Sequence, residues 1–177
     1  MRPSITSLRK RPISFVGMMG TGKTTLGRII AQRLAIPFID TDHYIEAEQG
    51  RTIPDIFARD GEKAFRDIEA SAIKSILDKN ENVVIATGGG IVTTPQSLAM
   101  LKDKTHMFWL QATPENIFAR IKKDPNRPLL QTENPLQQLK DLLEKRQDLY
   151  AQAHHHIVLN EGNPHATVDE VIDLIQG

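Results

Sequence analysis

The sequence predicts an α/β fold in which a parallel sheet of about five strands carries helices on both faces. Short apolar runs such as residues 83–86 lack polar alternation, which is typical of strands buried on both faces of a parallel sheet. These runs alternate with segments whose apolar residues recur at helical spacing. No internal repeat or low-complexity tract interrupts this order. The pattern and the length of 177 residues predict one domain over residues 1–177.

The elements follow from local patterns along the chain. Apolar runs place the strands at 13–16, 37–40, 83–86, 105–110 and 157–159. Gly50 and Gly61 are expected to end helices, because glycine adopts the left-handed backbone that terminates them. Apolar periodicity or capping residues predict helices over about 22–35, over a stretch that includes residue 45, over 62–78, from 95 to at least 101, from 114 onwards, over 136–149 and from a capping box at 167–170.

The glycine-rich loop from Gly17 to Thr24 reads G-x-x-x-x-G-K-T and stands between the first predicted strand and the first predicted helix. This order is the context that a phosphate-binding loop requires. Glycines let backbone N–H groups converge on a polyphosphate, and the positive end of the helix points at the same anion. Lys23 supplies a cation for the β- and γ-phosphates, and Thr24 a hydroxyl for Mg²⁺. The loop therefore predicts nucleotide binding.

Further polar groups follow the carboxyl ends of predicted strands, where open α/β sheets bind ligands. Asp40 and Asp42 leave the second strand, so one carboxylate is expected near the metal and the other near an acceptor hydroxyl. The alternative is that they cap the following helix. Three successive glycines, Gly88 to Gly90, suit close approach of a ligand to backbone N–H groups better than a simple turn.

Two arginines and one irregular segment complete the candidate site. Arg66 and Arg146 lie on predicted helices, where an arginine is either a ligand-binding group or a surface charge. Residues 120–133 contain several basic side chains and two prolines without apolar periodicity. We expect this segment to form a mobile, basic lid over phosphates.

Composition narrows the class of protein. Lys plus Arg and Asp plus Glu number 22 each, so no overall basic charge recruits nucleic acid or an anionic membrane. The absence of cysteine excludes disulfides and thiol catalysis, and no run has the length of a membrane span or signal peptide. We expect a monomeric cytoplasmic enzyme without nucleic-acid or membrane partners. The basic segment 1–12 is expected to be a frayed terminus.

Together these residues resemble the shikimate kinase family. The motifs that carry the resemblance keep the family's order and spacing from about Ile13 to Ile175 and are Gly17-Met18-Met19-Gly20-Thr21-Gly22-Lys23-Thr24-Thr25, Asp40-Thr41-Asp42, Ile56-Phe57 with Gly61-Glu62, Phe65-Arg66-Asp67-Ile68-Glu69, Thr87-Gly88-Gly89-Gly90, Arg127-Pro128-Leu129-Leu130, and Arg146 with Leu149-Tyr150. The resemblance implies a P-loop NTPase-type fold and transfer of the γ-phosphoryl group of ATP to the 3-hydroxyl of shikimate, a step towards chorismate and the aromatic amino acids.

The resemblance also assigns roles. ATP-binding residues would be Gly20, Thr21, Gly22, Lys23, Thr24, Thr25, Arg120 and Arg127. Among them, Lys23 and Arg127 would neutralise the transferring phosphate, and Arg120 would lie near adenine. Thr24 and Asp40 would stand on the Mg²⁺ side, Asp40 through water.

On the acceptor side, Asp42 would hold the ring hydroxyls and act as a base. The substrate carboxylate would be gripped by Arg66 and Arg146, whose guanidinium groups suit bidentate contacts, while Gly88 to Gly90 would supply backbone contacts. The predicted catalytic set is therefore Lys23, Asp42 and Arg127.

The chain departs from the family pattern at two places. His154, His155 and His156 follow the Leu-Tyr pair, and we expect an edge segment there rather than a metal site, because neighbours in a strand point to opposite faces. Gly162 stands near Asn163-Pro164 where some members have arginine, which leaves the adenine contacts near Asn163 and Pro164 unassigned.

Two rival functions are kept open. A gluconate-type small-molecule kinase shares the loop and the size, but it would not need the Phe-Arg pair and triple glycine. A catalytically silent nucleotide-binding module would not need Lys23, Asp42, Arg66, Arg127 and Arg146 all intact.

Overall fold

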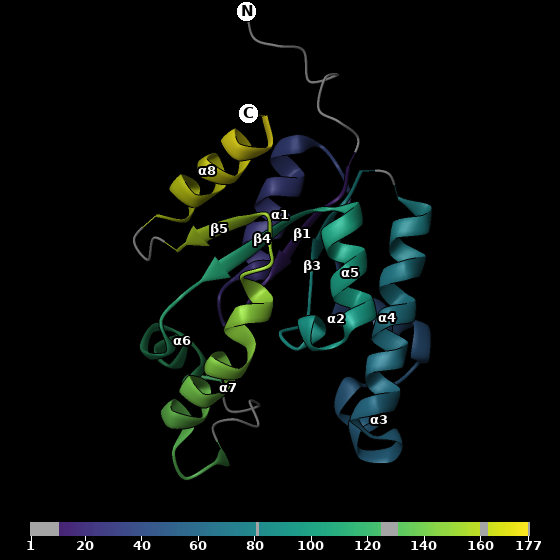
Figure 1. The fold of residues 1–177 in the computed structure, drawn as a ribbon, viewed down its shortest axis with the longest axis vertical. Coiled ribbons are helices and arrows are strands. Elements are labelled where there is room, and N and C mark those ends of the chain that lie inside the picture. The colour runs from purple at the N-terminus through teal and green to yellow at the C-terminus, as the bar shows by residue number, and fades with distance from the viewer. Residues whose placement is uncertain (1–10, 81, 125–130, 160–162, 177) are drawn as a thin grey trace, which may run out of the picture.

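The sheet is parallel and has five strands, as the sequence predicts (Figure 1), and the structure gives their order as β2-β3-β1-β4-β5. The computed structural model describes residues 11–80, 82–124, 131–159 and 163–176. The strands are β1 (Ile13–Val16), β2 (Phe38–Asp40), β3 (Val84–Ala86), β4 (His106–Gln111) and β5 (His155–Val158). Because β1 is central, the loop that follows it emerges in the middle of the carboxyl edge.

Helices cover both faces of the sheet (Figure 1). Residues of α1 and α8 pack in one core with Ile13 and Phe15, whereas α4, α5, α6 and α7 contribute to a second core that contains Val16. This division follows from the alternation of side chains along a strand. The helical elements are α1 (Lys23–Leu34), α2 (Thr41–Gln49), α3 (Ile53–Asp60), α4 (Glu62–Lys79), the 3₁₀ helix η2 (Ile91–Thr93), α5 (Pro95–Lys104), α6 (Pro114–Ile121), α7 (Pro135–Tyr150) and α8 (Pro164–Gln176).

Some predicted helix ends are wrong. The last helix begins at Pro164, because the Asn163 side chain accepts hydrogen bonds from the N–H groups of His165 and Ala166. Thr167 is buried inside α8, so the predicted capping box does not start that helix. Thr113 caps α6 as predicted, whereas the side chain of Thr94 makes no capping hydrogen bond at α5.

The predicted lid, about residues 120–133, overlaps the last two residues of α6 and otherwise stays a prediction. Arg120 belongs to the last turn of α6, which extends to Ile121, because Ile117 and Ile121 of this helix pack into the core beside the sheet. Residues 125–130 lie outside the described part of the chain, and they include residue 127, the predicted catalytic arginine. Residues 1–10 of the predicted leader and Gly162 lie outside it as well.

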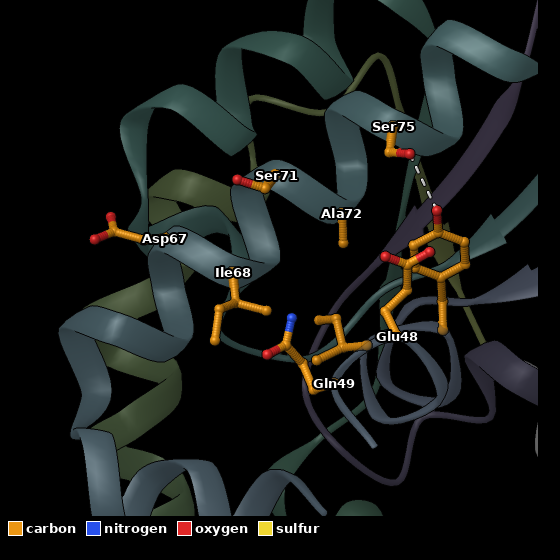
Figure 2. Close-up of a pocket in the computed structure, with 9 residues that line it drawn as sticks. Glu48, Gln49, Asp67, Ile68, Ser71, Ala72 and Ser75 are labelled. Atoms are coloured by element: carbon orange, nitrogen blue, oxygen red, sulfur yellow. Dashed lines mark hydrogen bonds between the residues drawn. The ribbon is translucent and has the colours of Figure 1, made fainter. Parts of the chain in front are cut away.

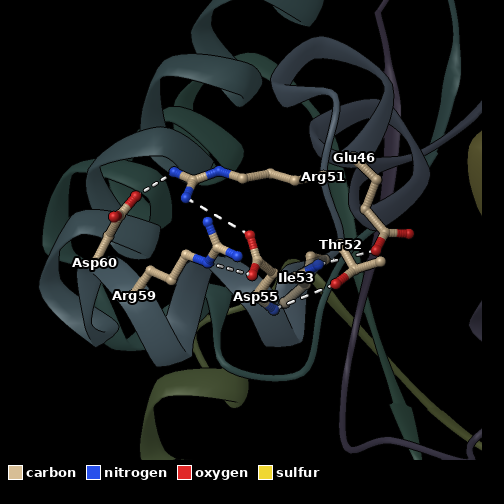
Figure 3. Close-up of polar contacts among 7 residues, drawn as sticks. All are labelled: Glu46, Arg51, Thr52, Ile53, Asp55, Arg59 and Asp60. Carbon is tan, nitrogen blue, oxygen red and sulfur yellow. Dashed lines mark hydrogen bonds and ion pairs between the residues drawn. The ribbon is translucent and has the colours of Figure 1, made fainter.

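The helices α2, α3 and α4 form a substructure beside β2 and β3, with its own apolar cluster of Ile45, Ile56, Phe65 and Ala72. Polar contacts tie its turns together (Figure 3). Arg51 pairs with Asp60 and, at 3.9 Å, with Asp55. Glu46 of α2 accepts a hydrogen bond from the N–H group of Ile53 at 2.9 Å. These contacts fix α3 relative to α2 and to the turn that joins them.

The three histidines end up at the sheet edge, as expected for an edge segment. His154 Nδ1 accepts a hydrogen bond from the N–H group of Met107 at 3.0 Å. The ring of His155 stacks on Phe108, and that of His156 meets the edge of Trp109. In the described ranges, no helix has both the length and the apolar character needed to cross a bilayer.

Candidate active site

The loop between β1 and α1 has the backbone of an anion-binding turn. Gly20 has φ 73°, and a Cβ added there would lie 2.6 Å from Ile121 Cγ2. Gly22, at φ 84°, is the N-cap of α1 and makes no side-chain cap. Only glycine fits such positions without strain, and the first N–H groups of α1 remain directed at the loop.

Lys23 brings a positive charge into this loop. Its Nζ donates to the carbonyl oxygens of Gly17 at 2.7 Å and Met18 at 2.9 Å, and the residue is 8% exposed. Thr21 Oγ1 donates to the Met18 carbonyl, and Arg120 Nη1 donates to the Gly20 carbonyl at 3.2 Å. The loop therefore holds its own lysine and meets Arg120 of α6, while Thr25 lies exposed in the first turn of α1.

Thr24 and Asp40 form an oxygen-rich corner beside the loop. Thr24 Oγ1 donates to Asp40 Oδ2 at 2.7 Å. Asp40 Oδ1 accepts from the N–H groups of Asp42 and His43, which makes Asp40 the cap of α2. The alternative that Asp42 caps this helix is wrong, because Asp42 already lies in its first turn.

Asp42 points instead to the loop after β3. Its Oδ1 lies 3.0 Å from the place where a Cβ of Gly88 would stand. Burial and the nearby carboxylate of Asp40 raise the pKa of Asp42, while Lys23 opposes this shift. Asp42 is thus a partly desolvated carboxylate set between the phosphate-binding loop and the triple glycine.

Arg66 lies across the site from Asp42 and is held by Glu69. Arg66 Nη1 donates to Glu69 Oε1 at 2.9 Å, and Glu62 approaches the same guanidinium from the solvent side at 3.5 Å. The Glu69 side chain is 1% exposed, and its Oε2 has no hydrogen-bond partner among the described residues. Burial raises the pKa of Glu69 to about 7, against the opposing effect of Arg66.

Sequence reasoning did not assign a function to Glu69. The available signal was its spacing of three residues from Arg66, which puts both side chains on one face of a helix. Periodicity cannot tell which face of α4 meets the site, so a buried ion pair and a surface pair give the same pattern.

The triple glycine joins these groups. A Cβ added to Gly88 would lie near Asp42 and Glu69. One added to Gly89 would lie 3.5 Å from Arg146 Nη1, and one added to Gly90 would overlap Arg66 Nη2. The Cβ added to Gly89 would also lie 3.5 Å from the backbone nitrogen of Met19 in the phosphate-binding loop. A Cβ at Gly89 would therefore only reach ordinary contact distance where the two loops meet, whereas one at Gly90 would displace the Arg66 guanidinium.

The carbonyls of this turn are occupied, whereas two of its N–H groups have no acceptor among the described residues. Gly88 O accepts from Ile91 N, Gly89 O from the Tyr150 hydroxyl, and Gly90 O from Thr93. Gly88 N donates to Thr41 Oγ1. Within the part of the chain that the structure describes, the N–H groups of Gly89 and Gly90 donate to nothing. Two backbone donors therefore remain for a ligand, beside two guanidinium groups and one carboxylate.

A separate groove of about 290 Å³ lies between α2 and α4 (Figure 2). It is lined by Tyr44, Ile45, Glu48, Gln49, Asp67, Ile68, Ser71, Ala72 and Ser75. None of the predicted site residues lines it, so this groove is distinct from the candidate site.

A five-stranded parallel sheet with a phosphate-binding loop after its central strand defines a P-loop protein of the small-molecule kinase type. The family model for shikimate kinase matches residues 19–176. Over 163 residues, the chain is 44% identical to a shikimate kinase of Burkholderia thailandensis, and this alignment covers 92% of this chain and 86% of that protein. The chain belongs to the shikimate kinase family.

Solved structures agree with this assignment. A shikimate kinase from Acinetobacter baumannii, solved in complex with shikimate, superposes with a TM-score of 0.89 at 38% identity and covers 98% of this chain and 97% of its own. A gluconokinase from Sinorhizobium meliloti gives 0.60 at 15% identity, covering 95% of this chain and 93% of its own, which shows a shared fold alone.

Proposed function

We propose that this protein is an ATP-dependent shikimate kinase that phosphorylates the 3-hydroxyl of shikimate to give shikimate 3-phosphate and ADP. Family membership supports the reaction. The observation that carries it is the meeting of the Gly88–Gly90 turn, Asp42, Arg66 and Arg146 beside the phosphate-binding loop. This arrangement suits an acceptor that has both a carboxylate and hydroxyl groups, because arginine recognises carboxylates through paired N–H donors.

In the proposed mechanism, the loop N–H groups and Lys23 bind the phosphates of ATP and stabilise the charge that develops on the transferring group. Arg66 and Arg146 hold the substrate carboxylate, and the free N–H groups of Gly89 and Gly90 orient the acceptor. Asp42 takes the hydroxyl proton, a role that its raised pKa favours. Residue 127, which lies outside the described residues, is proposed as a second phosphate-neutralising cation.

Mg²⁺ is the proposed cofactor. The oxygens of Thr24 and Asp40 fit it, since Mg²⁺ prefers few protein oxygens together with water and phosphate ligands. The ion would neutralise phosphate charge when bound with ATP. Among the described residues there is no cluster of three metal-binding side chains, and this mode of binding does not need one.

The test is a coupled assay of ADP release with purified protein, ATP, Mg²⁺ and either shikimate or gluconate. We expect release that depends on shikimate and is lost by orders of magnitude in Asp42→Asn, with nucleotide binding retained. Asp67→Asn is the matched control, because Asp67 is exposed on the same substructure and lines the separate groove. Absence of shikimate-dependent release from the unaltered protein would sink the proposal, and release with gluconate alone would support the rival kinase.

Single-domain organisation, a monomeric state, a cytoplasmic location and the role of Arg120 near adenine stay predictions from the sequence.

A further inference from the structure

Tyr150 is a buried tyrosine whose hydroxyl meets the acceptor turn. It ends α7, one helical turn after Arg146, and is fully buried. Its ring stacks on Trp109 of β4 with centroids 5.7 Å apart, which limits the position of the hydroxyl. That hydroxyl donates to the Gly89 carbonyl at 2.5 Å. A side chain 61 residues away in sequence therefore holds the middle of the triple glycine.

This hydrogen bond sets the direction of a backbone donor. The carbonyls of Gly88 and Gly90 are held by Ile91 and Thr93, within the turn's own segment. Among the described contacts of the three carbonyls, Gly89 O is the one held by a residue distant in sequence. Because a trans peptide is planar, fixing Gly89 O fixes the Gly90 N–H group in the opposite direction. One hydroxyl thus orients one of the two free donors of the acceptor site.

The same hydroxyl lies beside the phosphate-binding loop. It is 3.7 Å from Met18 Sδ, and the Cβ position of Gly89 is 3.6 Å from Gly17 O. Burial raises the pKa of Tyr150, with Arg146 opposing the shift, so the hydroxyl stays protonated at neutral pH and acts as a donor. Tyr150 stands where the turn and the phosphate-binding loop touch.

We propose that Tyr150 is a positioning residue that holds the Gly88–Gly90 turn against Met18, so that the acceptor meets the transferring phosphate in register. The part of this inference that concerns the acceptor rests on the proposed function. The part that concerns the turn does not, and it is tested without substrate.

The first arm compares hydrogen exchange of a peptide covering residues 87–94 in the unaltered protein, Tyr150→Phe and Tyr44→Phe. Phenylalanine keeps the ring packing but removes the hydroxyl. We expect exchange at Ile91 and Thr93 to rise about tenfold in Tyr150→Phe, the factor that corresponds to losing one hydrogen bond, with the amides of β1 as an internal reference. Tyr44 is the only other tyrosine in the sequence and is the matched control. Its hydroxyl forms a 3.1 Å hydrogen bond with Ser75 Oγ, outside the turn. Unchanged exchange at 87–94 would overturn the proposal.

The second arm measures shikimate and ADP binding by calorimetry. Tyr150→Phe is expected to weaken shikimate binding about tenfold, while ADP binding stays within about twofold and Tyr44→Phe changes neither. Equal loss of both ligands would show a merely structural role and overturn the proposal, as would unchanged shikimate affinity. If the unaltered protein does not bind shikimate, the proposed function fails, and the exchange arm still decides whether Tyr150 holds the turn.

Discussion

Replacing Glu69 by glutamine should remove a pH dependence of stability. The Glu69 side chain is 1% exposed and its pKa is raised from 4.5 to about 7, mainly by burial. Between these two values the folded protein keeps a proton that the unfolded chain has released. The stability that this proton contributes is therefore fully present below about pH 4.5 and is lost as the pH rises through about 7.

The size of the effect follows from the shift. A difference of about 2.5 pH units corresponds to about 3.5 kcal/mol in total, at about 1.4 kcal/mol per unit. Over the range from about pH 5.5 to about pH 8, Glu69 should reduce the free energy of unfolding by about 2 kcal/mol. Glutamine has no proton to lose. Over the same pH range, the free energy of unfolding of Glu69→Gln should therefore rise by this amount relative to that of the unaltered protein. That rise corresponds to about 4–8 °C in melting temperature for a chain of this size.

The assay is denaturant unfolding of both proteins at a series of pH values. Subtracting one curve from the other removes the contribution of groups that the two proteins share. Glu62→Gln is the matched control, because Glu62 is a carboxylate that contacts the same guanidinium but its side chain is 68% exposed. A Glu69→Gln difference that is flat between acid and alkaline pH would refute the reasoning.

Three further substitutions separate the two halves of the site. Lys23→Met should lower kcat by at least about 100-fold in the ADP-release assay; activity within tenfold of the unaltered enzyme would exclude Lys23 from catalysis. Gly90→Ala should weaken shikimate binding by about tenfold or more in calorimetry, because the added methyl overlaps Arg66, and an equal loss of ADP binding would contradict this. Arg66→Lys keeps the charge but loses the paired donors, so the KM for shikimate should rise about tenfold with the KM for ATP unchanged, and a rise in both would count against a role in the acceptor site.

The sheet and the phosphate-binding loop could be predicted from the sequence because both depend on local sequence patterns. The prediction for 83–86 lies within one residue of β3, since an uninterrupted apolar run needs burial on both faces. The prediction for 13–16 coincides with β1. The loop glycines follow from steric demands that only glycine meets.

The acceptor side was predicted less completely, because its contacts join residues that are far apart in sequence. Asp42, Arg66 and the triple glycine could be chosen as candidates from their residue types and positions. The burial of Glu69 and the contact from Tyr150 to Gly89 depend on which face each helix turns inward. Asn163 was not predicted as a cap, although Asn-Pro stands at the start of α8 as Thr-Pro does at α6.

The central position of β1 divides the molecule into two parts that could be exchanged separately. Asp42, Arg66 and the Gly88–Gly90 turn all come from residues 42–90, on the β2–β3 side of β1, whereas the nucleotide loop follows β1 itself and Asp40 lies outside this segment. Replacement of this one continuous segment can therefore change the alcohol that is phosphorylated and leave the nucleotide machinery intact. Among the described residues, α7 reaches across from the other side with Arg146 and Tyr150, so a chimeric enzyme must carry a matching α7 with the exchanged segment.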